Sequence, residues 1–364
     1  MKKTILYIID SLERGGAEVL LVSSLKEVHR HFNIIIVTLR PQIAFTEKEL
    51  CCDKMFCLDM HHKKSILQHA VKLRKIIVEN KVDIVHSTLY WSVITARLAC
   101  TKKIKHVFSL ATIMSSGIYH HKWYSGYTRL LDQLTYTGSQ AVISPTNEVL
   151  NDFDKTIGIK GRKKVIYNFV NDEFFNNEIE YKKPCDNMKL VAVGNLKDVK
   201  NYQLIIDAFK LLKGHNISID IYGEGPDRGI LQKQIEEFNL PINLMGVEEK
   251  IYEVLPFYDG FVMCSLVEGF GISAAEGMAV GLPLLLSDIK TLREISRGNA
   301  IFFNPSHPQS FAEAVLSMKS ESIDLLRLSA EGKKIAKENY TKEKHLKRLL
   351  NFYDELLKTN GQLI

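Results

Sequence analysis

One stretch of the sequence decides the fold: residues 260–283, which read GFVMCSLVEGFGISAAEGMAVGLP. The apolar run 260–264 predicts a buried strand, and the glycines at 269 and 271 predict a tight loop after it. The small residues that follow from Ile272 predict a helix that other groups can approach closely. The first backbone N–H groups of a helix are free and lie at the positive end of its dipole. This strand–loop–helix unit therefore predicts an anion site.

Two carboxylates belong to the same unit. Glu268 lies on the predicted loop and Glu276 lies about one turn into the predicted helix. They would repel a phosphate if they faced it, whereas a carboxylate readily accepts hydrogen bonds from neighbouring hydroxyl groups. The ligand that this arrangement predicts has a sugar on one side of a diphosphate and a ribose on the other.

Short runs rich in valine and isoleucine alternate with helix-length segments along the whole chain. Such alternation indicates βαβ units and parallel sheets. In the first half the predicted strands are 4–9, 33–38, 82–86, 105–109, 140–144 and 164–167. In the second half they are 189–194, 217–222, 242–245, 260–264, 283–286 and 300–303.

The alternation breaks once, at the polar stretch 171–187, which we interpret as a linker. The sequence thus predicts an α/β fold with two doubly wound parallel-sheet domains, residues 1–170 and 188–341, that face each other across a cleft. Ligands bind such sheets at the carboxyl ends of their strands. The tail 338–357 carries leucines at helical spacing and predicts a final helix, residues 342–364 in our division of the chain.

Several further motifs lie in order along the chain. They are LERGGAE (12–18), IYNFV (166–170), VGNL (193–196) followed by Lys200-Asn201, IYGEGP (221–226) and Met245-Gly246. Together with EGFG (268–271) and EGMAVGLP (276–283), they resemble the pattern of the retaining glycosyltransferases of family 4, over about 300 residues. The resemblance implies the GT-B fold, with two Rossmann-like domains and a last helix that crosses back onto the first domain.

The resemblance also implies a role for each matching position. Glu268 would contact the hydroxyl groups of the donor sugar, Glu276 the ribose, and Lys200 the diphosphate, so that Glu268 and Lys200 are the catalytic candidates. The remaining expected donor-binding residues are Gly16, Asn195, Gly246, Val247, Phe270, Gly271 and Ile272. The amides of 270–272 would hold the sugar and phosphates, Gly16 would approach the phosphate nearest the sugar, and the backbone of 246–250 would border the base.

The implied reaction is transfer of a hexose-type sugar from a UDP-sugar or GDP-sugar to a glycan or lipid-linked saccharide, with retention of configuration. No metal and no other cofactor is expected, because Lys200 and the helix amides would stabilise the leaving diphosphate. The setting we expect is the synthesis of cell-surface polysaccharides or glycoconjugates.

The chain departs from the family at two places. Asn195 stands where members often carry arginine, and no histidine follows the strand 105–109. We therefore assign no catalytic histidine. His86 ends a strand and either faces the cleft or is a hydrogen-bonded structural residue, and we favour the structural role.

Other patterns resemble metal-binding sites only weakly. Asp152-Phe153-Asp154 matches a metal-binding triplet of a different glycosyltransferase fold, but we interpret it as solvated surface. His61-His62 and His120-His121 lack the spacing and the carboxylate partners of a metal site.

Composition limits the remaining possibilities. The chain has 364 residues, of which 46% are hydrophobic and 25% charged, as in an ordinary globular protein. Six scattered cysteines without a Cys-x-x-Cys pair indicate a reduced, intracellular protein. The apolar start 5–9 is too short for a secretory signal, and no window reaches the length of a membrane span. The expected location is cytoplasmic.

Charge is divided unevenly along the chain. Residues 1–170 hold 25 Lys and Arg against 14 Asp and Glu, whereas the whole chain has a net charge of only +6. With the aromatic and basic run 120–124, this balance predicts that the first domain binds an anionic acceptor, such as a polyprenyl-diphosphate-linked sugar, or an anionic membrane surface. Nucleic acid is not an expected partner, since no binding module accompanies the charge.

Two alternative functions remain open beside the transferase. One is a non-catalytic partner subunit that binds a nucleotide sugar, suggested by Asn195 and the missing histidine. The other is a nucleotide-sugar epimerase of the same two-domain shape. A dinucleotide-dependent dehydrogenase is disfavoured, because no strand is followed by Gly-x-Gly-x-x-Gly.

Overall fold

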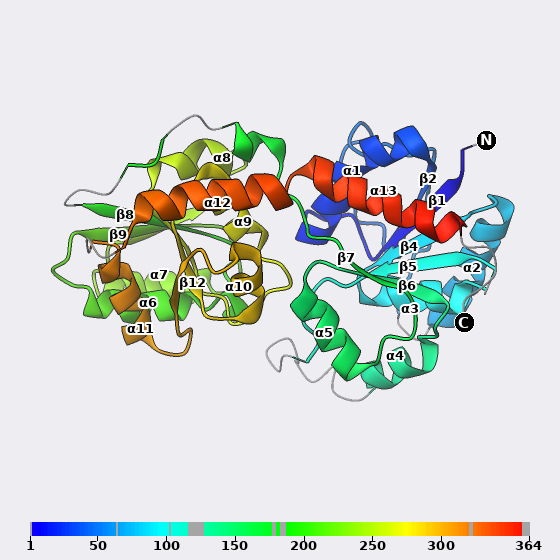
Figure 1. The fold of residues 1–364 in the computed structure, drawn as a ribbon. Helices are drawn as coiled ribbons and strands as arrows, with labels where there is room; N and C mark the ends of the chain where they lie inside the picture. The colour runs from blue at the N-terminus through cyan, green and yellow to red at the C-terminus, as the bar shows by residue number, and fades with distance from the viewer. Residues whose placement is uncertain are drawn as a thin grey trace. The chain divides into compact units, whose positions relative to one another are not determined.

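The computed structural model describes residues 2–62, 65–101, 103–115, 127–176, 180–182, 187–319 and 323–358. The chain forms two compact units (Figure 1). The first unit is 1–168 with 342–364, and the second is 169–341.

The first unit is built on a seven-stranded sheet in the order β3-β2-β1-β4-β5-β6-β7. All of its strand pairs are parallel. The strands are β1 (Thr4–Ile9), β2 (Asn33–Thr38), β3 (Lys54–Cys57), β4 (Ile84–Thr88), β5 (Lys105–Ser109), β6 (Gln140–Ser144) and β7 (Lys163–Val165). The helices are α1 (Gly16–His31), α2 (Ile66–Glu79), α3 (Tyr90–Ala99), α4 (Arg129–Thr135), α5 (Asn147–Thr156) and α13 (Lys342–Lys358).

The last helix, α13, belongs to the core of the first unit although it follows the second unit in the chain. Its apolar face, with Leu346, Leu349 and Phe352, packs in one cluster with Ile5 of β1 and Leu25 of α1. The helix runs beside α1 (Figure 1). Burial of this face explains why the chain returns to the first unit.

The second unit has a six-stranded parallel sheet in the order β10-β9-β8-β11-β12-β13. The strands are β8 (Met188–Val193), β9 (Ile217–Tyr222), β10 (Ile242–Gly246), β11 (Gly260–Met263), β12 (Leu284–Ser287) and β13 (Ile301–Phe303). The α-helices are α6 (Tyr202–Leu211), α7 (Arg228–Glu237), α8 (Ile251–Val254), α9 (Ile272–Val280), α10 (Lys290–Ser296), α11 (Pro308–Ser317) and α12 (Leu325–Asn339). Short 3₁₀ turns are η3 (Asp172–Phe175), η4 (Asp198–Lys200) and η5 (Leu255–Phe257).

The predicted fold class, two doubly wound parallel sheets, is confirmed. Within the stretch interpreted as a linker, residues 172–175 form η3 and are counted with the second unit. Phe174 of η3 is buried, and its ring packs edge-on against Tyr252 of α8 with the ring centroids 5.9 Å apart. An aromatic side chain that packs in this way fixes the segment to the second unit.

Candidate functional site

The loop between β11 and α9 is shaped by a glycine that no other residue could replace without strain. Gly271 precedes α9 with φ +88°, a conformation that side-chain-bearing residues rarely adopt. A Cβ at this position would also lie 2.9 Å from Cδ2 of Leu292. Within the described residues, the backbone N–H groups of Ile272 and Ser273 have no hydrogen-bond acceptor. The start of α9 is therefore free to bind an anion.

Lys200 and Glu268 meet at this edge of the sheet. Lys200 follows β8 on η4, and Glu268 follows β11, the neighbouring strand. Lys200 Nζ lies 2.5 Å from Glu268 Oε1, and the two side chains are 22% and 12% exposed. The two catalytic candidates thus form an ion pair that is largely shielded from solvent. A phosphate that binds Lys200 therefore competes with the Glu268 carboxylate for the ammonium group.

Two buried side chains hold the backbone beneath this ion pair. Thr291 at the start of α10 donates its hydroxyl to the carbonyl oxygen of Glu268 at 3.0 Å. The thiol of Cys264 donates to the carbonyl oxygen of Lys200 at 2.9 Å. Burial raises the pKa of Cys264 to about 12, so that its sulfur keeps the proton it donates. Neither residue was predicted from the sequence, because one short polar side chain in an apolar segment has no recognisable pattern.

Glu276 stands apart from the ion pair, on α9. It is half-buried and makes no hydrogen bond or ion pair with any residue in the described part of the chain. Burial raises the pKa of its carboxyl to about 7. The group is ready to accept hydrogen bonds from a ligand, but it binds a proton near neutral pH when no ligand is present.

The other candidates of the second unit lie on loops at the same edge. Asn195 follows β8, is exposed and makes no side-chain hydrogen bond with any described residue. Gly246 ends β10 with φ +80°, and Val247 after it is 71% exposed. Phe270 is buried with its ring against Tyr340, so only its backbone can face a ligand. Gly16 is the first residue of α1, in the other unit.

A close backbone approach joins three of these loops. The N–H of Gly223, after β9, donates to the carbonyl oxygen of Gly246 at 2.7 Å. A Cβ at Gly223 would lie 2.1 Å from the carbonyl oxygen of Gly194, which follows β8. Gly223, in the sequence motif 221–226, is therefore needed to bring these loops together.

The structure decides the role of His86. Its Nδ1 lies 2.5 Å from the hydroxyl of Tyr353, and its Nε2 lies 2.7 Å from Oγ of Ser109. Burial lowers the pKa of His86 to about 3 and keeps the ring neutral. The interpretation of His86 as a hydrogen-bonded structural residue is confirmed.

The interpretation of Asp152 as solvated surface is wrong. Its side chain is buried on α5 and accepts hydrogen bonds from the backbone N–H groups of Met114 and Ser115, at 2.6 and 3.1 Å. Asp152 therefore anchors the loop after β5.

Among the described residues, no group of His, Cys, Asp and Glu side chains could hold a metal ion. His120-His121 and the run 120–124 lie outside the described residues.

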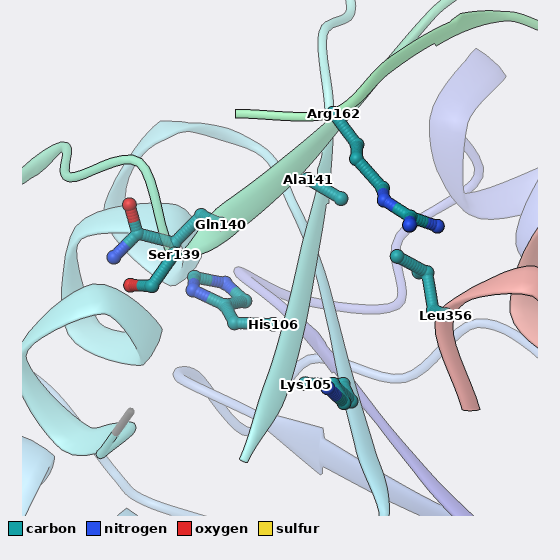
Figure 2. Close-up of a pocket in the computed structure, with 7 residues that line it drawn as sticks. All are labelled: Lys105, His106, Ser139, Gln140, Ala141, Arg162 and Leu356. Atoms are coloured by element: carbon teal, nitrogen blue, oxygen red, sulfur yellow. The ribbon is translucent and has the colours of Figure 1, made fainter. Parts of the chain in front are cut away.

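A pocket beside β5 and β6 is too small for a substrate. It encloses about 20 Å³ next to His106, Gln140 and Arg162 (Figure 2). That volume is room for about one water molecule. Within the described ranges the buried Nδ1 of His106 has no hydrogen-bond partner, which suits such a water.

No helix in the described ranges is both long enough and apolar enough to cross a membrane.

Models of known protein families match both halves of the chain. A model described as Glycosyltransferase Family 4 matches residues 14–174. A second model, described as Glycosyl transferases group 1, matches residues 174–335. The two matches meet at residue 174 and together extend over most of the chain.

Individual proteins resemble the chain over most of its length. The uncharacterized glycosyltransferase MJ1178 of Methanocaldococcus jannaschii is 28% identical over 308 residues, which are 80% of this chain and 81% of that protein. The N-acetylgalactosamine-N,N'-diacetylbacillosaminyl-diphospho-undecaprenol 4-alpha-N-acetylgalactosaminyltransferase of Campylobacter jejuni is 23% identical over 78% of this chain and 80% of its own. The crystal structure of Anabaena HepE in complex with UDP and glucose superposes with a TM-score of 0.80, at 16% identity, over 96% of this chain and 99% of that one.

Proposed function

Because the chain belongs to glycosyltransferase family 4, with the GT-B fold, we propose that it transfers a hexose-type sugar from a nucleotide diphosphate sugar to a saccharide acceptor, with retention of configuration. One observation carries the proposal. Lys200 and Glu268 follow the neighbouring strands β8 and β11, and α9, which carries the free amides and Glu276, begins at the same edge of the second sheet. A cation and amides for a diphosphate, beside two carboxylates for hydroxyl groups, match the chemistry of this donor.

Lys200 stabilises the leaving group in this mechanism. The bond between the anomeric carbon and the diphosphate oxygen breaks, its electron pair goes to the diphosphate, and the sugar acquires oxocarbenium character. Lys200 exchanges Glu268 for the diphosphate, and with the α9 amides it offsets the growing negative charge. These groups supply the positive charge without a metal ion.

Glu268 orients the sugar. Once Lys200 binds the diphosphate, the Glu268 carboxylate accepts hydrogen bonds from donor hydroxyl groups. The acceptor hydroxyl attacks the anomeric carbon on the face that the diphosphate leaves, and its proton passes to a phosphate oxygen. The configuration of the anomeric carbon is therefore retained without a covalent intermediate on Glu268.

Glu276 binds the ribose, and the loop after β10 borders the base. Val247 exposes an apolar side chain beside Gly246, where a base could stack. The donor is a UDP-sugar or a GDP-sugar, and thermal unfolding with each nucleotide tests this choice. A ligand at a hundredfold excess over its Kd stabilises the folded state by about 2.7 kcal/mol.

The acceptor is a glycan or a lipid-linked saccharide of cell-surface polysaccharide or glycoconjugate synthesis. The name of the Campylobacter relative, whose acceptor is carried on diphospho-undecaprenol, supports this class. The basic balance of residues 1–170 supports an anionic acceptor at the cytoplasmic membrane surface. Flotation of the protein with liposomes that contain anionic lipid, but not with neutral liposomes, is the expected result.

Nucleotide affinity should depend on pH through Glu276. Only the ionised carboxylate accepts both ribose hydroxyl groups, and its pKa is about 7 in the free protein. Lowering the pH from 8 to 6 therefore weakens nucleotide binding by about tenfold through this group alone. Calorimetric titration of wild type and Glu276→Gln measures it. The variant binds more weakly at pH 8 and loses this part of the pH dependence, whereas titration of the phosphate affects both proteins equally. Equal pH slopes would contradict the role of Glu276.

The same substitution should stabilise the protein without ligand. The carboxyl has a higher pKa in the folded protein than the ordinary value of 4.5, so it destabilises the fold increasingly as the pH rises from about 4.5 through 7. Glu276→Gln is therefore expected to raise the unfolding midpoint at pH 8 and to leave it nearly unchanged at pH 4.

Thr291 should affect turnover through the backbone of Glu268. Thr291→Val keeps the shape of this buried side chain but removes the donor to the Glu268 carbonyl oxygen. We expect kcat to fall about tenfold, because a misplaced reacting group is costly, with a smaller change in nucleotide affinity. Thr291→Ser keeps the hydroxyl and should retain most of the activity. Equal activity of the two variants would show that the hydrogen bond has no role in positioning.

A further inference from the structure

The first unit contains a cavity that the donor site does not use. It encloses about 290 Å³ at the carboxyl ends of β4 and β5. Its wall is formed mainly by apolar side chains, among them Leu89, Val93, Phe108, Ile113, Met114 and Phe153. Doubly wound sheets bind their ligands at this edge.

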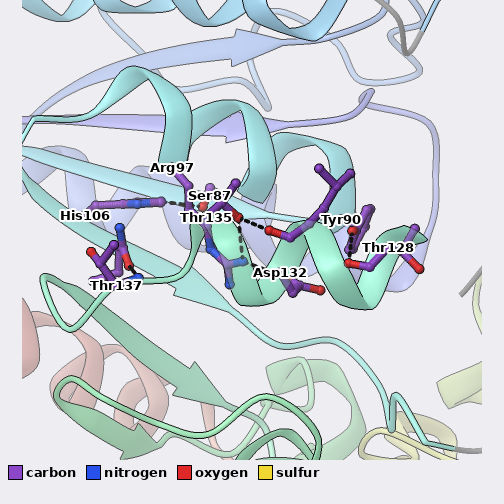
Figure 3. A network of polar contacts seen from close by, with 10 residues as sticks. Ser87, Tyr90, Arg97, His106, Thr128, Asp132, Thr135 and Thr137 are labelled. Atoms are coloured by element: carbon purple, nitrogen blue, oxygen red, sulfur yellow. Dashed lines mark hydrogen bonds and ion pairs between the residues drawn. The ribbon is translucent and has the colours of Figure 1, made fainter. Parts of the chain in front are cut away.

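The charged residues of the wall are already paired with each other. Arg97 and Asp132 form an ion pair with side chains 1% and 3% exposed (Figure 3). The Arg97 guanidinium also lies over the ring of Phe108, 4.4 Å from its centroid. Tyr90, next to them, donates its hydroxyl to the carbonyl oxygen of Thr128 at 2.9 Å (Figure 3). The described part of the wall therefore presents no net charge to an occupant.

Two buried polar atoms of the wall have no hydrogen-bond partner among the residues that the structure describes. They are Nε of Arg97 and Oγ1 of Thr112. A buried polar atom without a hydrogen bond is destabilising, so an occupant with an oxygen atom would gain from meeting one of them. The cavity thus suits an apolar molecule that carries oxygen at one end.

The backbone at the cavity is strained. Leu89, which joins β4 to α3 and lines the cavity, has φ 71° and ψ 154°. A side-chain-bearing residue is rarely found there, and such strain persists mainly at ligand sites and other functional positions. The strain fixes the direction in which α3, with Tyr90, Val93 and Arg97, leaves the sheet.

We propose that this cavity binds the hydrocarbon chain of a lipid-linked acceptor, taking about its first ten carbon atoms next to the phosphate end. The proposal rests on the acceptor class of the proposed function. The apolar wall sets the chemistry of the ligand, and the volume sets its length. A dry cavity of about 150 Å³ holds one benzene molecule, so one nearly twice as large holds two five-carbon isoprenoid units.

Chain length is the variable that tests this proposal. Dimethylallyl, geranyl and farnesyl monophosphates, with five, ten and fifteen carbons, are titrated below their micelle concentrations, with inorganic phosphate as the headgroup control. Affinity should rise at least tenfold from five to ten carbons, because each buried methylene adds apolar area. It should rise less than threefold from ten to fifteen. Equal affinities for all three, or binding no tighter than that of inorganic phosphate, would overturn the proposal.

Substitutions at the cavity provide a second test of the proposal. Ala111→Trp, at the exposed mouth, and Val93→Phe, on the wall, should each weaken geranyl phosphate binding at least tenfold. Leu130→Trp on α4 is 52% exposed, does not line the cavity and should change nothing. The nucleotide-induced shift of the unfolding midpoint serves as the folding control, since its site lies in the second unit. If all three proteins bind geranyl phosphate equally, the cavity is not the site.

The proposed function and the cavity can fail separately. Transfer to a water-soluble saccharide without any prenyl phosphate binding would overturn the cavity proposal and leave the transferase intact. Absence of binding of any nucleotide would overturn the proposed donor site, whatever the lipid result.

Discussion

Glu268→Ala is expected to reduce the rate of sugar transfer by at least ~100-fold, the size of effect seen when one transition-state contact is removed. The carboxylate is 12% exposed and lies against Lys200, so it is close to the charge that develops on the leaving group. Without it, the donor hydroxyl groups lose the acceptor that fixes the sugar above the diphosphate.

The same variant should bind nucleoside diphosphate at least as tightly as the wild type. In the ligand-free protein the Lys200 ammonium is paired with the Glu268 carboxylate. Removing the carboxylate leaves the ammonium available to the diphosphate. Initial rates and calorimetric titration measure the two properties. Glu237→Ala removes an exposed carboxylate at the end of α7 and is the matched control. Normal transfer by Glu268→Ala would exclude the assigned role.

Lys200→Ala is expected to lose both sugar transfer and tight binding of nucleoside diphosphate. Transfer should fall at least ~100-fold, because no other side chain of the proposed site supplies a positive charge to the leaving diphosphate. The carboxylate of Glu268 would also remain without its partner and would repel the phosphates. Affinity for a nucleoside diphosphate should therefore fall steeply, while affinity for the nucleoside alone stays unchanged.

Lys197→Ala is the matched control, since Lys197 is an exposed lysine three residues earlier on the same loop. The pair can be examined further with the double variant. Residues in direct contact are not energetically independent, so Lys200→Ala with Glu268→Ala should bind nucleoside diphosphate better than Lys200→Ala alone. If Lys200→Ala bound the diphosphate like Lys197→Ala, Lys200 would not be its ligand.

The sheets were predictable from the sequence because parallel strands are buried on both faces and are continuous apolar runs. Each predicted strand is present within about two residues of its predicted ends. The sequence did not reveal β3. It is a short edge strand whose residues 54–57 are half-buried or exposed, so it lacks the apolar run that indicates a strand.

The candidate site was predictable only where a motif marks it. Glu268 and Glu276 lie in the glycine-rich stretch, and Lys200 follows the predicted start of the second domain. Their partners were not predictable: the contact between Lys200 and Glu268 joins positions 68 residues apart, and Thr291 carries no motif. The side chain of Asp152 was misinterpreted because a polar residue within a helix is more often exposed, and only the fold shows that it caps the loop after β5. The cavity beside α3 likewise depends on side chains from separate segments.

The central claim is that the second unit binds a nucleotide sugar through Lys200, Glu268 and Glu276. Calorimetric titration of the wild type with UDP, GDP, ADP and CMP tests it most directly, followed by titration of Lys200→Ala and Glu276→Gln with the nucleotide that binds. The account predicts saturable binding of UDP or GDP, at least tenfold weaker in each variant at pH 8. Failure of the wild type to bind any of the four nucleotides, or equal affinity in the wild type and both variants, would contradict it.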